Sequence, residues 1–154
     1  MDNKEKIQQN YKVAVEGIDL AWLSNNNTKW YDYIVALPDP LLKSYLIVVF
    51  NNQVFNGGFD QYFVNGYGQF ASETIEALRE IGAMRKAELL EKAFNRINVS
   101  GDVNVVFRGR LLKNEIQSLF TDGQLSDFLE ELDNRYYDDQ EDLEKLLGNF
   151  LMFP

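Results

Sequence analysis

Residues 38–68 read PDPLLKSYLIVVFNNQVFNGGFDQYFVNGYG, and their pattern constrains the fold class of the whole chain. Asp39 followed by Pro40 predicts a helix start, with an N-cap and a proline at the first helical position. The apolar run Tyr45–Phe50 predicts that this helix is central and buried. Ile, Val and Val within the run would also suit a strand, but no alternating partner strand or hairpin turn lies nearby. Asn56–Gly58 is expected to end the helix, before a short aromatic segment and a second break at residues 65–68.

On both sides of this stretch, apolar residues recur every three or four positions, which is the spacing of one helix face. Helices are predicted over residues 3–23, around 30–37, and over 72–82, 87–97, 111–119, 125–136 and 143–151, while 103–107 fits either an extended piece or a helix start. No internal repeat or long linker divides the chain. The sequence therefore predicts one all-α domain over residues 1–154, a bundle of about six to eight helices with a glycine-rich break in the middle.

The composition excludes several classes of chemistry. The chain has 154 residues, of which 24 are acidic and 15 basic, with no histidine and no cysteine. It therefore has no disulfide, no cysteine or histidine zinc site and no histidine-based catalytic triad. Its longest apolar run is far shorter than the ~20 residues that span a bilayer, and no apolar signal-peptide stretch follows Met1. We expect a globular cytoplasmic protein.

The net charge of −9 is distributed unevenly along the chain. Residues 122–154 contain ten acidic and two basic residues, a net charge of −8. Residues 79–113 contain eight basic and four acidic residues, a net charge of +4, and we call them the basic segment. Such a charge pattern repels naked nucleic acid and anionic membranes, with a weak local exception at the basic segment.

The acidic C-terminal region predicts either a solvated helix surface or a binding surface for a basic protein. At 100° per residue, its acids lie opposite the apolar stripe of the predicted helix over residues 125–136. In the binding interpretation, which we prefer, the partner is a protein with a basic face, such as a DNA-binding protein. The residues predicted to contact it are Asp127, Glu130, Glu131, Asp138, Glu141 and Asp142.

The glycine-rich segment, Asn56 to Gly68, supports a second functional hypothesis. Phosphate binding there is improbable, because no lysine or arginine lies between Ser44 and Leu78. The glycines are typical of a sharp chain reversal with close helix contact, a purely structural role. The functional alternative is a small-ligand or peptide pocket lined by Asn56, Tyr62, Asn65 and Tyr67. A third hypothesis is a self-assembling structural protein, in which the basic segment of one copy meets the acidic C-terminal helices of another.

Catalysis and metal binding are not expected. The carboxylate pairs Glu16 with Asp19 and Glu73 with Glu76 lie one helical turn apart, but such pairs are common by chance. The stretch from Asp133 resembles a calcium loop in acidity alone, since Arg135 replaces a ligand and no central glycine follows. We predict a non-enzymatic protein without cofactor or metal.

Three groups of residues resemble the bacterial DNA-mimic protein family. They are Asn56 to Asn65 (NGGFDQYFVN), Glu76-Ala77-Leu78 with Ile81-Gly82-Ala83, and Leu132 to Tyr137 (LDNRYY) before Asp142-Leu143-Glu144. The resemblance covers about residues 38–154 and leaves residues 1–37 as an N-terminal helical extension. It implies a small, acidic, all-helical cytoplasmic protein, dimeric in its named member. It also implies binding to a DNA-binding transcription regulator, which is thereby kept from its operator.

Overall fold

A computed structural model describes residues 1–24, 28–116 and 120–152. Within these residues the chain forms only helices, which confirms the predicted all-α fold. They are α1 (Asn3–Glu16), α2 (Leu20–Ser24), α3 (Lys29–Val35), α4 (Asp39–Val64), the 3-10 helix η1 (Tyr67–Phe70), α5 (Ala71–Glu80), α6 (Met84–Ile97), α7 (Asn104–Leu112), α8 (Gly123–Asp138) and α9 (Leu143–Met152). None of them has the length and apolarity needed to cross a membrane, as far as the chain is described.

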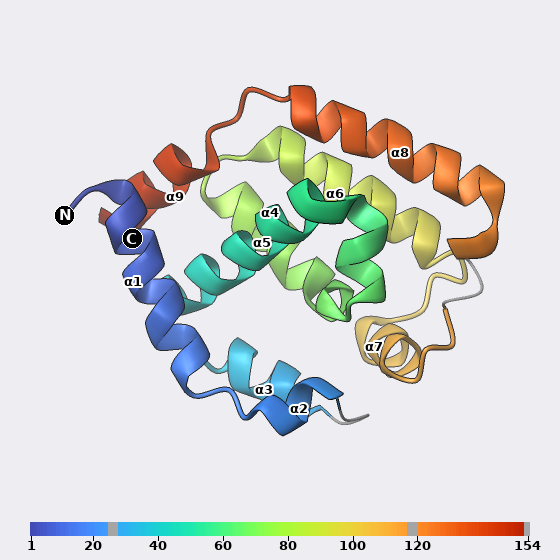
Figure 1. The fold of residues 1–154 in the computed structure, drawn as a ribbon, viewed down its shortest axis with the longest axis horizontal. Coiled ribbons are helices and arrows are strands. Elements are labelled where there is room, and N and C mark those ends of the chain that lie inside the picture. The colour runs from blue at the N-terminus through green and yellow to red at the C-terminus, as the bar shows by residue number, and fades with distance from the viewer. Residues whose placement is uncertain (25–27, 117–119, 153–154) are drawn as a thin grey trace.

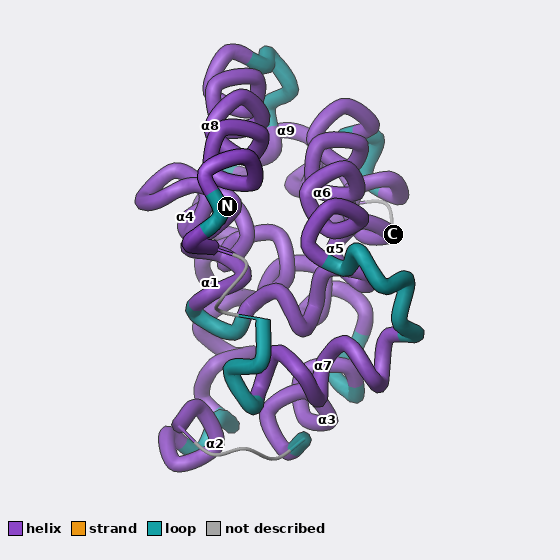
Figure 2. The backbone as a smooth tube through the Cα atoms, turned by 90° about the vertical axis from the view of Figure 1, so that its right-hand side faces the viewer, coloured by secondary structure: helices purple, strands orange, loops and turns teal. Residues whose placement is uncertain are grey.

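Helix α4 is the centre of the molecule, as its apolar run predicted. It packs against α1, α5, α8, α9 and η1 (Figure 1). Phe50, Phe59, Tyr62 and Phe63 of this helix have no exposed surface. Figure 2 shows α6 and α8 together at one end of the molecule and α2, α3 and α7 toward the other. The core that these helices enclose is continuous and rich in aromatic side chains.

The glycine-rich break is a kink at Gly58 inside α4, at the place where the sequence predicts the helix to stop, but the aromatic segment after it is helical and forms the second half of α4. Gly58 has φ +82° and ψ −178°, after which the chain resumes helical geometry as far as Val64. This conformation is essentially accessible to glycine alone. The N–H of Phe59, the first residue after the kink, donates to Oδ1 of Asp133 at 2.8 Å. The helix restarts because a carboxylate on α8 caps its second half.

The N-terminal helix differs from its prediction in one respect. The apolar pattern over residues 3–23 is divided at Gly17 into α1 and α2. An added Cβ at Gly17 would meet the hydroxyl of Tyr33 at 2.3 Å, and this hydroxyl donates to the carbonyl of Ala14 at 2.7 Å. The break therefore accommodates a side chain from α3. Helix α1 itself packs on α4 and α9, and Lys6 Nζ donates to the carbonyl of Leu151 at 2.9 Å, so residues 1–37 contribute to the common core.

Two further boundaries are settled. Of the two alternatives for residues 103–107, the helix start is confirmed, since α7 begins at Asn104. The helix predicted over residues 111–119 ends at Leu112, before Asn114 takes a positive φ of 59°. The end of that predicted helix, at residues 117–119, lies outside the described residues. At the start of α4, Asp39 is the first helical residue and not the predicted N-cap. Its carboxylate forms an ion pair with Lys43.

Candidate functional site

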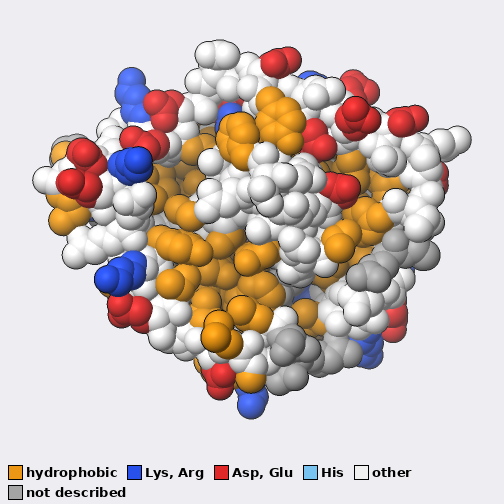
Figure 3. Space-filling model, viewed as in Figure 1, with side chains coloured by type: hydrophobic (Ala, Val, Ile, Leu, Met, Phe, Trp, Pro, Cys, Tyr) orange, Lys and Arg blue, Asp and Glu red, His pale blue; other side chains and the backbone are white. Residues whose placement is uncertain are grey.

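Helix α8 presents four carboxylates on one exposed strip. Asp127, Glu130, Glu131 and Asp138 are all exposed and lie within about 100° of one another around the helix axis. No ion pair or hydrogen bond within the described part of the chain engages any of these four carboxylates. We call these four residues the acidic face. Acidic side chains gather accordingly over α8 at the upper right of Figure 3.

The opposite side of α8 fixes the direction of the acidic face. Leu125, Leu129, Leu132 and Tyr136 are buried against the core, at the spacing that the sequence predicted. The hydroxyl of Tyr136 also donates to Oδ1 of Asn51 on α4 at 2.6 Å. Because these contacts hold α8 in one rotation about its axis, the four residues of the acidic face lie on its exposed side.

Asp133 connects α8 to the α4 kink. Its carboxylate accepts the Phe59 N–H, and an added Cβ at Gly58 would lie 2.3 Å from its Oδ2. Burial raises the pKa of Asp133, and the neighbouring carboxylates of Asp60 and Glu130 raise it further. The two sequence groups NGGFDQYFVN and LDNRYY are therefore in contact in the structure. Asp133 of the second group caps the helix at Phe59, and Gly58 of the first group leaves the space for its carboxylate.

An acidic cleft lies between α8 and the α4 kink. It has a volume of about 220 Å³ and combines the carboxylates of Asp60, Glu130 and Asp133 with an apolar wall. The wall includes Leu125 and Leu129. A lysine or arginine side chain suits such a cleft, because its aliphatic stem packs on apolar surface while its charged end meets carboxylates. Asp60 and Asp133 were not among the predicted contact residues.

Two of the predicted contact residues, Glu141 and Asp142, cap helices within the protein. Both carboxylate oxygens of Glu141 accept backbone N–H groups at the start of α6, from Arg85 at 3.0 Å and from Lys86 at 2.8 Å. Asp142 accepts the N–H of Lys145 at 3.0 Å and caps α9. These carboxylates satisfy helix N-termini, which accounts for their position in the loop between α8 and α9. They lie outside the acidic face.

The basic segment meets the acidic C-terminal region within a single copy. Arg85 Nε lies 2.6 Å from Asp139 Oδ1, and Lys86 Nζ lies 2.8 Å from Asp139 Oδ2. Lys86 also lies over the ring of Tyr136, 4.6 Å from its centroid. Other bases of the segment pair locally, namely Arg79 with Glu91, Lys92 with Glu88 and Arg110 with Asp102. The charge attraction that the self-assembly hypothesis placed between copies is thus used to join α6 to the end of α8.

The four predicted residues of the glycine-rich segment have different surroundings in the structure. Tyr62 is fully buried, and its hydroxyl lies 3.3 Å from Oγ1 of Thr74. Asn65 donates to Gln53 at 3.0 Å, Tyr67 packs edge-on against Trp30, and Asn56 is exposed. Four cavities among the described residues have linings that include none of the four. Tyr62 follows Phe59 at helical spacing, and both side chains are fully buried, so this part of the aromatic pattern belongs to the core.

Comparison with known proteins gives one match. The model of a family described as DMP19-like protein matches residues 35–152, which run from the end of α3 to the end of α9. The match therefore includes the α4 kink, Asp133 and the acidic face. No curated protein and no solved structure matches the chain. Among the described residues, no group of three or more acidic side chains is arranged to hold a metal ion.

Proposed function

The chain belongs to the DMP19-like protein family, and on this premise we propose that it is a non-enzymatic DNA mimic, which binds the DNA-contacting surface of a basic protein and keeps it from DNA. The partner in this proposal is a DNA-binding protein such as a transcription regulator. Complex formation takes place in the cytoplasm and requires no cofactor. The chain binds neither nucleic acid nor membrane directly, because its net charge of −9 repels both. A homodimer, which the family resemblance implies, is compatible with this role.

The acidic face is the observation that carries the proposal. An α-helix rises about 1.5 Å per residue, so Asp127 and Asp138 are separated by roughly 16 Å along α8. The four carboxylates of the acidic face thus follow one another at an average axial spacing of about 5.5 Å, against one phosphate per ~3.4 Å along a strand of B-DNA. A protein surface that neutralises successive phosphates would meet a row of carboxylates here, at a lower linear density than that of the phosphates.

The acidic cleft adds a means of specific recognition to this charge pattern. Exposed carboxylates alone provide attraction that salt screens within ~8 Å at physiological ionic strength. The cleft beside Glu130 offers a partly enclosed place for one basic side chain of the partner, with Asp60 and Asp133 on its wall. We place an arginine or lysine of the partner in this cleft, since desolvated charge contacts contribute more to affinity than contacts at the rim.

Reversing two charges of the acidic face should weaken the complex. Glu130→Lys with Glu131→Lys removes two attractions and adds two repulsions, and we expect a 10- to 100-fold loss of affinity, about 1 kcal/mol per position or somewhat more. The dissociation constant of the complex with the partner protein would be measured by calorimetry at several salt concentrations. The partner itself is obtained by salt elution from the immobilised chain in lysate of the source organism, followed by mass spectrometry.

A control of equal charge separates this effect from net charge. Glu16→Lys with Glu76→Lys changes the net charge by the same amount on α1 and α5, where both side chains are exposed. This control variant should keep most of the affinity for the partner. In a gel-shift assay, the wild type should release the partner from its DNA site, whereas the variant with Glu130→Lys and Glu131→Lys should not. Equal affinities of the face variant and the wild type would contradict the proposal.

A further inference from the structure

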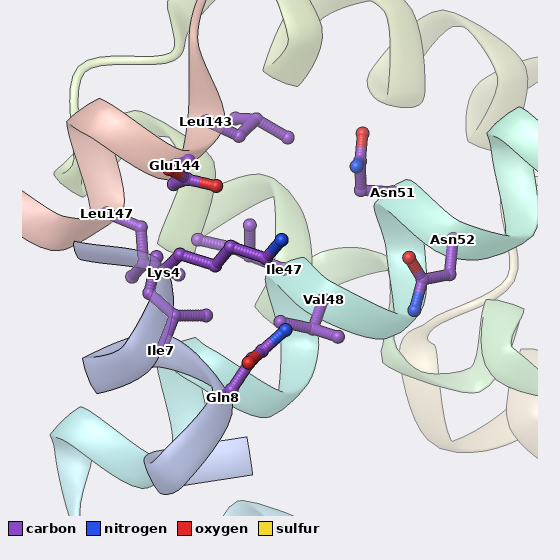
Figure 4. A pocket seen from close by; sticks show the side chains of 10 residues that line it. All are labelled: Lys4, Ile7, Gln8, Ile47, Val48, Asn51, Asn52, Leu143, Glu144 and Leu147. Atoms are coloured by element: carbon purple, nitrogen blue, oxygen red, sulfur yellow. The ribbon is translucent and has the colours of Figure 1, made fainter. Parts of the chain in front are cut away.

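A second concave site lies on the other side of the molecule, between α1, α4 and α9. It is a groove of about 250 Å³ (Figure 4). Its floor consists of aliphatic side chains, namely Ile7 from α1, Ile47 and Val48 from α4, and Leu143 and Leu147 from α9. In the space-filling view, apolar side chains reach the surface left of centre (Figure 3). We call this site the α1–α4–α9 groove.

The rim of the groove carries two opposite charges that do not pair with each other. Lys4 on α1 and Glu144 on α9 are both exposed and line the groove. No ion pair formed within the described part of the chain includes either of them. In Figure 4 the Lys4 ammonium extends toward the middle of the groove, and the Glu144 carboxylate lies on its α9 side. The groove thus offers one cation and one anion to a ligand above an apolar floor.

Carboxamides complete the rim, and one of them is held in position. Gln8, Asn51 and Asn52 line the groove beside the two charges. The hydroxyl of the buried Tyr136 donates to Oδ1 of Asn51 at 2.6 Å, which leaves the Asn51 NH₂ group as a hydrogen-bond donor on the groove side. Because this contact orients the amide before any ligand arrives, a ligand carboxylate would meet one positioned donor, Asn51, beside the exposed ammonium of Lys4.

We propose that the α1–α4–α9 groove binds a free aliphatic α-amino acid of the size of leucine. Its α-carboxylate contacts Lys4 and Asn51, its α-ammonium contacts Glu144, and its side chain packs on Ile47 and Leu147. The volume of the groove is slightly below the usual range of about 300–1,000 Å³ for ligand pockets, which favours a ligand this small. The floor contains no aromatic side chain and no charge, which favours an aliphatic side chain over an aromatic or basic one.

This inference is independent of the proposed DNA mimicry. None of the groove residues belongs to α8 or to the acidic face. Lys4, Ile7 and Gln8 also lie before residue 35, where the family match begins. The groove is therefore built jointly by the matched region and by the preceding helix, and its ligand would be a property of this chain that the family match does not supply.

The test is a titration of the full chain with L-leucine, in which binding is monitored through the amide chemical shifts measured by NMR. We expect saturable shifts at the amides of Ile7, Val48 and Leu147, with a dissociation constant in the range of roughly 0.1–10 mM, as is usual for ligands of few atoms. Three related compounds identify what is recognised. Glycine lacks the aliphatic side chain, N-acetyl-leucine amide lacks both charges, and isoamylamine lacks the carboxylate, so each should bind at least tenfold more weakly.

Variants locate the site. Lys4→Gln and Glu144→Gln should each weaken leucine binding by about fivefold to tenfold, since each removes one charge contact. Lys12→Gln and Glu16→Gln, which alter exposed charges elsewhere on α1, should leave it unchanged. The absence of saturable shifts at the groove with leucine would overturn the proposal. Equal binding of N-acetyl-leucine amide would also overturn it, because the two rim charges would then play no part in recognition.

Discussion

Replacing Asp139 by asparagine should lower the free energy of unfolding by about 3 kcal/mol at neutral pH. The side chains of Asp139 and Lys86 are only 7% and 4% exposed, and their charged groups are 2.8 Å apart. Without the carboxylate, the Lys86 ammonium stays buried over the ring of Tyr136 and has lost its ion-pair partner. The loss exceeds that expected for a surface pair because a buried unpaired charge must be desolvated or must lose its proton.

Urea denaturation of the two proteins would measure this difference. Asp138→Asn is the matched control, since Asp138 is the neighbouring residue, is exposed and belongs to the acidic face. Its unfolding free energy should stay within about 0.5 kcal/mol of the wild type. If Asp139→Asn were no less stable than Asp138→Asn, the contact between α6 and the end of α8 would contribute little to the fold.

The same contact predicts a pH dependence of defined sign. Burial opposes ionisation of Asp139, but hydrogen bonds from Arg85 and Lys86 outweigh burial and lower its pKa from 3.8 to about 2. Because the folded carboxylate stays ionised at lower pH than the unfolded one, its stabilisation is fully present above pH 3.8 and is lost as the pH falls toward 2. The difference in stability between the wild type and Asp139→Asn should shrink over this interval.

Local patterns predicted what depends on the period of a helix. The spacing of Leu125, Leu129 and Leu132 identified the buried side of α8, and with it the outward direction of Asp127, Glu130 and Glu131. Geometry within one helix follows from 3.6 residues per turn and needs no knowledge of neighbours. This is why the exposure of these acids on one side of α8 follows from the sequence alone.

Contacts between distant segments were not predictable in the same way. Glu141 and Asp139 meet the start of α6 across more than 50 residues of sequence, and periodicity does not reveal which acid caps which helix. The charge reversal between the basic segment and the C-terminal region is the available signal, and the self-assembly hypothesis, one of three, places the resulting attraction between copies. The division of the first helix at Gly17 has the same origin, since its cause is Tyr33 on another helix.

Pockets were the least predictable feature. The α1–α4–α9 groove takes its residues from three helices whose adjacency only the packing establishes. The acidic cleft shows the intermediate case, because Gly57 and Asp60 come from the glycine-rich segment and were near the predicted pocket. The predicted pocket includes aromatic residues of that segment, of which Tyr62 is buried in the core. Gly57 and Asp60 instead line the acidic cleft, whose other wall is formed by α8.

Replacing Gly58 by alanine should lower the free energy of unfolding by about 3 kcal/mol, with two separable causes. The first is backbone strain, since φ +82° with ψ −178° costs a residue with a Cβ about 1–3 kcal/mol. The second is the approach of Asp133, whose Oδ2 would lie 2.3 Å from the new Cβ. Asp133 cannot simply move away, because its Oδ1 holds the Phe59 N–H, and a lost helix cap costs roughly another 1 kcal/mol.

A second glycine and a double variant separate these causes in urea denaturation. Gly109 lies inside α7 with no atom within 4 Å of an added Cβ, so Gly109→Ala should stabilise the chain by about 0.5–1 kcal/mol. In an Asp133→Ala background the clash at Gly58 is absent, and Gly58→Ala should then cost only the strain. If the full loss persisted in that background, Asp133 would not lock the kink. The rotation of α8 about its axis, and with it the direction of the acidic face, would then depend only on Tyr136 and the buried leucines of α8.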